Sequence, residues 1–148
     1  MTYIIQILLG YILADLLSGI YHFFTDRGYN IKSQVDLFQR HHDVPEELDF
    51  DYRPMVIGIP FLLMALAGFY PLFWIVLGSA LSISQFIHYY THQTPPAPIA
   101  FLQKFGIIMG KVHHDEHHKG EHDANYCIIS GWNNWWMNKV IKLCTKSR

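Results

Sequence analysis

Histidines in closely spaced groups are the residues of this chain best suited to chemistry. There are ten of them among 148 residues, arranged as His22, His41-His42, His88-x3-His92, His113-His114-x2-His117-His118 and His122. Neutral imidazole is the commonest metal ligand in proteins, and two histidines four residues apart share one face of a helix. A single zinc ion uses about four ligands, fewer than are present here. We therefore expect two metal ions held between helices.

The spacing also gives expectations for individual ligands. If residues 113–118 are helical, the four histidines of that stretch form two adjacent pairs, His113/His117 and His114/His118. We place His41 and His42 in a loop, where neighbouring side chains can diverge toward different ions. Asp15 has two alternative roles of equal weight: it orients a ligand histidine, or it makes a helix–helix hydrogen bond with Ser18 or a neighbour.

Apolar segments must position these histidines. Residues 3–24 are long enough to cross the roughly 30 Å hydrocarbon core of a bilayer as one helix. Residues 55–92 contain no Lys, Arg, Asp or Glu, and Pro71 divides them because proline starts a helix well and breaks its interior. We predict a helical hairpin with arms 55–69 and 71–92, the first arm depending on tilt or a thinner bilayer.

The basic residues give an orientation. All eleven lie either between residues 27 and 53 or after residue 100. The positive-inside rule then puts the N-terminus outside and both polar segments in the cytoplasm. The prediction is one domain over residues 1–148: an all-α integral membrane protein with about three transmembrane helices, interfacial helices and a histidine-rich metal site at the cytoplasmic side.

Other segments refine this prediction. Residues 98–112 are apolar but short, which favours an interfacial or re-entrant helix leading into His113. Residues 126–143 combine tryptophan and lysine as headgroup-region segments do, and we interpret Trp132–Trp136 as an interface anchor rather than a substrate clamp. Cys127 and Cys144 fit no paired motif and are expected as free thiols. The formal charge of -1 gives no basic bias toward nucleic acid.

The first apolar segment does not have the features of a cleaved signal peptide. It lacks a basic start and an Ala-x-Ala site, and it carries Asp15 and His22. We therefore expect it to be retained as a membrane helix. The sequence shows no targeting segment, so we expect a bacterial plasma membrane, with the endoplasmic reticulum as the alternative.

The ligand type narrows the metal. Imidazole suits iron, zinc, copper and nickel alike. A site with eight or more histidines beside a membrane best suits two non-haem irons. Such a pair can activate O2 and remove hydrogen from an unactivated C–H bond, which no side chain does unaided.

The chain resembles the lipid desaturases that include plasmanylethanolamine desaturase, the Kua-type proteins, and the plant desaturase of phosphatidylglycerol acyl chains. The resemblance covers about residues 14–134. The motifs that carry it are Ala14-Asp15-x2-Ser18-Gly19-x2-His22-x3-Asp26, Phe38-Gln39-Arg40-His41-His42-Asp43-Val44-Pro45, His88-x3-His92-Gln93, Leu102-Gln103, His113-His114-x2-His117-His118 and His122-x3-Tyr126-Cys127-Ile128-x2-Gly131-Trp132-x-Asn134.

This resemblance implies a membrane di-iron desaturase that acts on a phospholipid chain. The placement of the histidines at the cytoplasmic ends of the helices favours carbons near the headgroup over carbons in the middle of the chain. It implies O2 as co-substrate and an external electron donor, cytochrome b5-like or ferredoxin-like. Asp26 matches a motif position as a ligand or as a group that holds one. The implied iron ligands are His22, His41, His42, His88, His92, His113, His114, His117, His118 and His122.

Three alternatives remain open at this point. A di-iron lipid hydroxylase differs only in the fate of the substrate radical. A membrane zinc peptidase is suggested by His113-x-x-Glu116-His117, with Glu116 as general base, although this leaves most histidines unexplained. A metal transporter or sensor is the non-enzyme alternative, but transporters usually place their ligands at the bilayer midplane.

Overall fold

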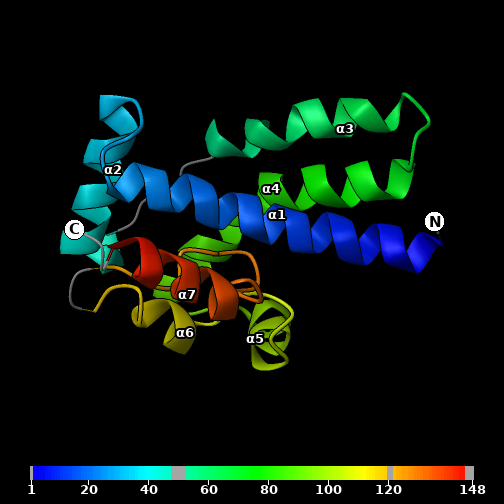
Figure 1. The fold of residues 1–148 in the computed structure, drawn as a ribbon. Coiled ribbons are helices and arrows are strands. Elements are labelled where there is room, and N and C mark those ends of the chain that lie inside the picture. The colour runs from blue at the N-terminus through cyan, green and yellow to red at the C-terminus, as the bar shows by residue number, and fades with distance from the viewer. Residues whose placement is uncertain (1, 48–52, 120–121, 146–148) are drawn as a thin grey trace.

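The computed structural model describes residues 2–47, 53–119 and 122–145, and the regular structure of these residues is entirely helical (Figure 1). The all-α class is thereby confirmed. The elements are α1 (Tyr3–Asp26), α2 (Lys32–Asp43), the 3-10 helices η1 (Pro45–Glu47) and η2 (Arg53–Gly58), α3 (Ile59–Ala65), α4 (Pro71–His92), α5 (Ala97–Lys104), α6 (Lys111–Asp115) and α7 (Asn134–Thr145).

Two helices, α1 with 24 residues and α4 with 22, are long and apolar enough to cross a membrane. Pro71 starts α4 as predicted. The first arm of the hairpin is shorter than predicted, because α3 begins only at Ile59, with Pro60 in its first turn, after a 3-10 segment. The described residues thus supply two candidate spans, and a third span stays a prediction.

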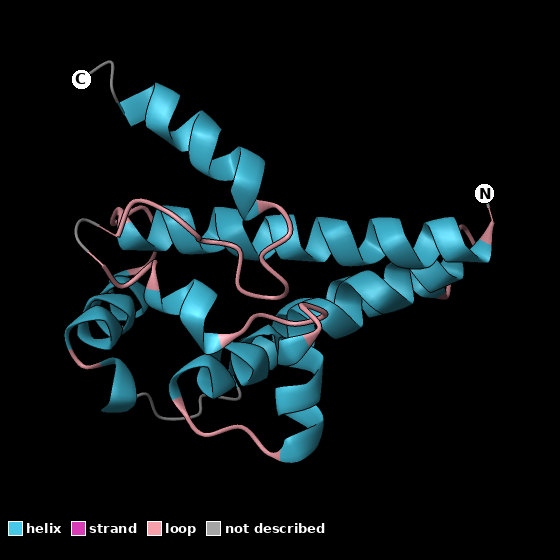
Figure 2. Ribbon diagram, turned by 90° about the horizontal axis from the view of Figure 1, so that it is seen from below, coloured by secondary structure: helices cyan, strands magenta, loops and turns pink. Residues whose placement is uncertain are grey.

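The two long helices lie side by side and run in the same direction. Gly10 of α1 is close to the start of α4, where an added Cβ would stand 2.6 Å from the carbonyl oxygen of Phe73. At the other end, the rings of His22 and His88 have centroids 5.9 Å apart. Figure 2, seen from below, shows the long helix α1 running inward from the N-terminus. α3 runs back along α4 in the opposite direction (Figure 1). The histidines of α1 and α4 therefore meet at one end of the molecule.

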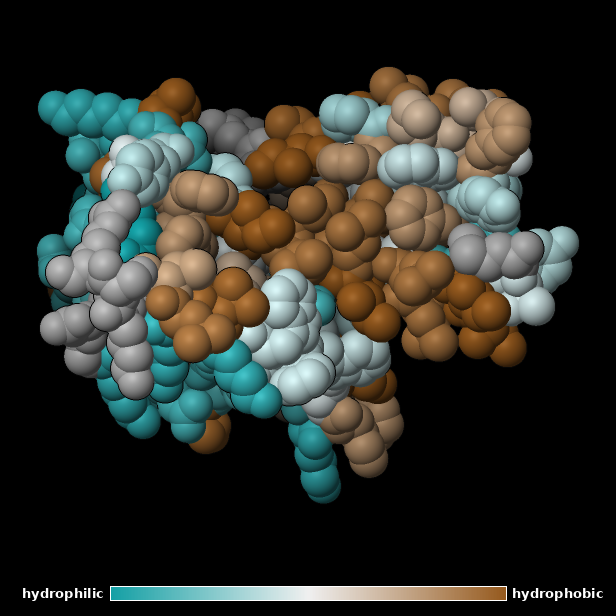
Figure 3. Space-filling view, in the orientation of Figure 1, coloured by the Kyte–Doolittle hydropathy of each residue, from teal (hydrophilic) through white to brown (hydrophobic). Residues whose placement is uncertain are grey.

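Apolar and polar surfaces separate along this axis. The first half of α1 and α3 with its turn expose large apolar side chains, including Tyr3 at 73%, Leu66 at 84% and Phe69 at 76%. Figure 3 shows hydrophobic residues over these elements and hydrophilic residues at the opposite end, around α2. The described surface therefore has one end suited to a lipid environment and one end suited to water.

The second half of α1 is covered by the protein itself. Residues 126–133 are not helical, and α7 follows them. Tyr126, Cys127, Met137 and Ile141 form a buried cluster there. Cys127 is buried and Cys144 exposed, and both are free thiols as predicted. This cover brings the 124–134 segment against the part of α1 that precedes the histidines.

The predicted helix over 98–112 is also shorter in the structure. α5 ends at Lys104, and the chain turns at Gly106, whose φ of 64° is in the left-handed region that favours glycine. Trp132 caps this turn by donating its indole N–H to the Gly106 carbonyl oxygen at 2.8 Å. The extended residues after the turn lead into α6 and its histidines. Met109 there donates its backbone N–H to the Ile129 carbonyl oxygen at 2.8 Å.

Candidate metal centre

The ends of two long helices and two short helical segments converge on one site. α1 contributes His22 and Asp26, and α4 contributes His88 and His92. The other histidines of the site come from α2 and from α6 with the turn that follows it: His41, His42, His114, His117 and His118. Within the described residues, eight of the ten histidines fall into two adjacent groups.

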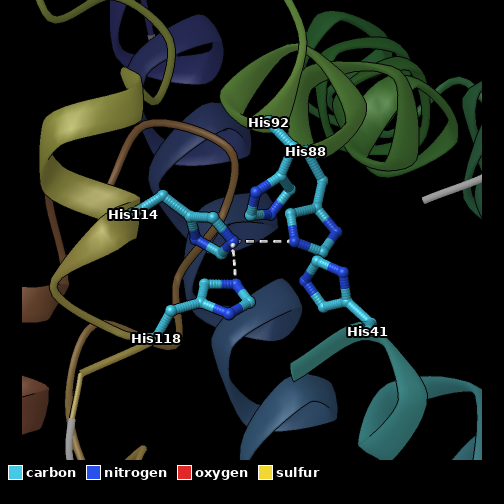
Figure 4. A group of neighbouring side chains, drawn as sticks. All are labelled: His41, His88, His92, His114 and His118. Atoms are coloured by element: carbon cyan, nitrogen blue, oxygen red, sulfur yellow. Dashed lines mark hydrogen bonds between the residues drawn. The ribbon is translucent and has the colours of Figure 1, made fainter. Parts of the chain in front are cut away.

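The first, which we call the five-histidine group, is drawn in Figure 4 and consists of His41, His88, His92, His114 and His118. One ring nitrogen of each lies within 4.8 Å of the others. The Nε2 atom of His114 lies 2.8 Å from that of His88 and 3.1 Å from that of His118. No carboxylate belongs to this group as described.

The second, the carboxylate group, consists of His22, Asp26, His42 and His117. The Nε2 atoms of His42 and His117 are 3.2 Å apart. The Asp26 carboxylate faces all three rings, at 3.4 Å from His22 Nε2, 3.6 Å from His42 Nε2 and 3.3 Å from His117 Nε2. Three imidazoles and one carboxylate thus point at a common centre.

These separations fit ligands of a shared ion. Two nitrogens bound at about 2.0–2.1 Å, with an angle of about 90–110° at the metal, lie about 2.8–3.4 Å apart. Two neutral nitrogens that face each other can share only one proton, so direct hydrogen bonds cannot satisfy the set. Buried atoms without a hydrogen-bond partner include His22 Nε2, both Asp26 oxygens and both His41 nitrogens. Because buried polar atoms normally have partners, the donor set fits bound metal.

The protonation of the rings agrees with this. Burial first, and the neighbouring histidines second, lower the pKa of His41 to about 2 and those of His42 and His118 to about 3. The same two causes, in the same order, hold the pKa of His114 well below its ordinary value. These imidazoles are therefore neutral near pH 7, which is the form that binds metal.

Backbone carbonyl groups orient two rings of the carboxylate group. The Nδ1 atom of His22 lies 3.2 Å from the Tyr126 carbonyl oxygen, and that of His117 lies 2.6 Å from the Ala124 carbonyl oxygen. Each Nδ1–H donates to its carbonyl oxygen, which leaves the Nε2 lone pair directed toward the group. Sequence reasoning missed both acceptors, since a backbone carbonyl has no residue signature.

Asp15 holds the segment that supplies these carbonyl groups. Its buried carboxylate accepts hydrogen bonds from the backbone N–H groups of Ser130 and Gly131 at 2.8 and 2.9 Å. Asn133 donates its backbone N–H at 3.1 Å and its side-chain amide at 3.0 Å. Within the described residues, the hydrogen bonds of this carboxylate go to residues 130–133 and to no histidine, so the first of the two alternatives, direct orientation of a ligand ring, is replaced by a clamp on residues 130–133. Ser18 donates instead to the Asp15 backbone carbonyl oxygen at 2.7 Å.

The prediction of a loop at His41 and His42 is wrong, because both lie in the last turn of α2. Their expected divergence is confirmed, since His41 joins the five-histidine group and His42 the carboxylate group. Consecutive residues of a helix point about 100° apart, so a helix separates them as well as a loop would.

The two pairs expected over residues 113–118 are realised in part. α6 ends at Asp115 and a turn follows, so His114 and His118 share a group whereas His117 enters the other. His113 is exposed, and its Nε2 lies 3.1 Å from the Asn134 amide nitrogen, outside both groups. A ligand role for His113 stays a prediction.

His122 lies at the edge of the carboxylate group. Its ring stacks on that of His42 with centroids 4.2 Å apart, and its ligand role also stays a prediction. It lines a polar pocket of about 410 Å³ together with Asp26, Arg27, His42 and Tyr126. The carboxylate group therefore borders a polar space that small molecules can enter.

Comparisons with known proteins agree with this site. The model of the lipid desaturase domain matches residues 11–144. The chain is 34% identical to "Fatty acid desaturase 4, chloroplastic" of Arabidopsis thaliana over 84% of this chain and 45% of that protein. It is 29% identical to "Plasmanylethanolamine desaturase" of Myxococcus xanthus, over 93% of this chain and 55% of that protein.

A mouse relative, "Plasmanylethanolamine desaturase 1", is 27% identical over 89% of this chain and 59% of that protein. The chain thus spans about half the length of these three curated relatives. No solved structure matches it. Because the domain match includes every histidine of both groups, the chain belongs to the lipid desaturase family.

Proposed function

We propose that this chain is a membrane di-iron desaturase that uses O2 to introduce a double bond into a phospholipid alkyl or acyl chain near the headgroup. The observation that carries the proposal is the pair of adjacent buried ligand groups in a chain of the lipid desaturase family. Five imidazoles form one group, and three imidazoles with a carboxylate form the other. One zinc ion uses about four ligands, fewer than the two groups offer together. Mixed histidine–carboxylate sets are typical of non-haem iron.

Bound iron would supply the activation of O2 and the removal of hydrogen from an unactivated C–H bond. Overall, two adjacent methylene groups lose one hydrogen each and become a double bond. O2, two electrons and two protons together with these hydrogens become two molecules of water. The electrons come from an external donor, cytochrome b5-like or ferredoxin-like, because the two free cysteines cannot hold an iron–sulfur cluster.

The chain's own residues prepare the site for this reaction. Ala124 and Tyr126 fix the rings of His117 and His22 through their carbonyl groups. His22, His114 and His117 have no exposed surface and His41, His88 and His92 are nearly buried, which keeps bulk water from six of the eight rings. Exclusion of water protects reactive species from side reactions.

The membrane placement is also part of the proposal. α1 and α4 cross the bilayer, and their histidine ends lie at the cytoplasmic side, where the basic residues are concentrated. Carbons close to a phospholipid headgroup lie at that depth. The polar pocket beside Asp26 and His42 is open on the same end, where a soluble or membrane-anchored donor could approach.

The zinc peptidase has less support than its motif suggested. His113 bonds to Asn134 whereas His117 faces Asp26, so the two do not converge on one ion. Glu116 is exposed and accepts a hydrogen bond from the Asn125 amide at 3.2 Å. A hydroxylase uses the same site and is separated from a desaturase by its product.

The test is the mass of the lipid product. The purified chain in phospholipid vesicles, with iron, O2 and a reducing system, is expected to give a lipid lighter by two hydrogens. The His117→Ala variant is the matched control and should give none. A product heavier by one oxygen would establish the hydroxylase, and peptide cleavage without O2 would establish the peptidase.

A further inference from the structure

A second pocket, of about 200 Å³, lies between α1, α3 and α4. Its walls include Leu17 and Tyr21 of α1, Phe61 of α3, and Leu81 and Gln85 of α4. It is separate from the polar pocket beside the carboxylate group and shares no lining residue with it. No residue of the two ligand groups lines this pocket, so metal binding does not account for it.

The pocket adjoins the boundary between the two ligand groups. Ser18 and Ser84 line it, and each lies four residues, or about one helical turn of 5.4 Å, before a ligand: His22 on α1 and His88 on α4. These two rings have centroids 5.9 Å apart. His22 belongs to the carboxylate group and His88 to the five-histidine group. One helical turn beyond the pocket, α1 therefore carries a ring of the carboxylate group and α4 carries a ring of the five-histidine group.

The three hydroxyl groups that line the pocket, those of Ser18, Tyr21 and Ser84, already have hydrogen-bond partners within the protein. The Ser18 hydroxyl donates to the Asp15 carbonyl oxygen and accepts the Ile128 backbone N–H at 3.2 Å. The Ser84 hydroxyl donates to the Leu81 carbonyl oxygen at 2.7 Å, and the Tyr21 hydroxyl donates to Gln34 at 3.1 Å. The pocket consequently presents mainly hydrocarbon surface, which favours an apolar occupant over a polar one.

Glycine contacts fix the outer wall. An added Cβ on Gly58 would stand 2.0 Å from the Gly78 carbonyl oxygen, and one on Gly78 would stand 2.7 Å from Leu62 Cγ. The backbones of η2 and α4 therefore touch, which sets the positions of the wall residues Ile57 and Phe61. Ile57 is 42% exposed, so this wall borders the outer apolar surface.

We propose that this pocket holds the segment of a lipid hydrocarbon chain that is presented to the metal centre. The inference rests on the proposed function for its occupant and adds the path of the substrate. The volume is below the roughly 300 Å³ of small-molecule pockets, so it suits part of one chain, with the rest of the lipid outside in the bilayer. The carbons deepest in the pocket would lie about one helical turn from His22 and His88, between the two ligand groups.

The test is photo-crosslinking of the full chain in vesicles of a phospholipid whose acyl chain carries a diazirine, with sites mapped by mass spectrometry. Leu81→Trp fills the pocket. Ile83→Trp, at a position 44% exposed on the same helix, is the matched control. Excluding each methylene lowers occupancy about fourfold, so excluding two lowers it about fifteenfold. We expect this loss of crosslinks at Leu17, Tyr21 and Gln85 in the Leu81→Trp variant, and unchanged crosslinks at these residues in the Ile83→Trp control.

Crosslinking needs no turnover, so its result is independent of whether the chain desaturates lipid. If the Leu81 variant fails to fold, Ser84→Phe provides the same obstruction from a half-buried position. Iron content per chain, equal to that of the unsubstituted protein, verifies that each variant is folded at the metal centre. Absence of pocket crosslinks in the unsubstituted chain, or equal crosslinks after obstruction, would overturn the inference.

Discussion

Replacing Asp15 should lower both the folding stability and the metal affinity of the protein, although its carboxylate belongs to neither ligand group. The Asp15→Ala change leaves four buried N–H groups of residues 130–133 without their acceptor. At about 1–3 kcal/mol for each unsatisfied group, the loss is about 4 kcal/mol or more. This is a large part of the roughly 5–15 kcal/mol that stabilises a typical domain. Asp15→Asn is milder because its one oxygen still accepts two of the bonds, and we expect a loss of about 2 kcal/mol.

The Asp15→Asn change should lower metal affinity at the carboxylate group and leave the affinity of the five-histidine group unchanged. Ala124 and Tyr126 belong to the clamped segment and orient rings of the carboxylate group only. Loss of such orienting contacts typically lowers metal affinity about 10–100-fold. In a chelator titration of the Asp15→Asn variant, one of two ions is therefore expected to leave at about 10–100-fold less chelator.

The assay combines thermal unfolding in detergent with this titration. The Asp15→Asn variant should melt about 4–8 °C lower, taking about 2–4 °C per kcal/mol. Asp36→Asn, the same chemical change at an exposed site on α2, should leave both readouts unchanged. An Asp15→Asn protein with unchanged melting and unchanged release of both ions would refute the clamp.

Two further predictions separate the ligands from their neighbours. His117→Ala should lose about one of two bound ions and all product, whereas His113→Ala should keep both ions because His113 lies outside both groups; elemental analysis of the two variants checks this, and equal loss in both would contradict the grouping. Acid should destabilise the metal-free protein. A histidine whose pKa is lower in the folded protein than its unfolded value of about 6.5 binds a proton more readily in the unfolded state. The stability that it contributes above pH 6.5 is therefore lost progressively as the pH falls toward about 3. From pH 7.5 to 5.5 the loss is about 1.4 kcal/mol for each such histidine, measurable as a falling melting temperature; a flat profile would contradict neutral burial. The histidines concerned are His41, His42 and His118.

The sequence was most informative where spacing along one helix decides the geometry. His88 and His92 are one turn apart on α4, and His22 and Asp26 are one turn apart on α1, as their spacing predicts. The helix around His41 was not recognised from the sequence because the buried residues of α2 are one phenylalanine, Phe38, and one histidine, His41. Val35 and Phe38 mark an apolar face of about one turn, and His41 continues that face with a polar residue, so the apolar pattern is too short to identify the helix.

Long-range contacts account for what spacing could not predict. The clamp joins Asp15 to residues more than a hundred positions later in the chain. Which ring of the 113–118 cluster enters which group depends on where α6 ends, and helix ends are the least predictable part of a sequence pattern. The division of the ligands into two groups therefore required the structure.

The most direct measurement is the metal content of the full chain, purified in detergent after iron-replete expression, by elemental mass spectrometry. Two ligand groups lead us to expect about two irons per chain, and about one in the His117→Ala variant. About one zinc per chain with little iron would contradict a di-iron centre.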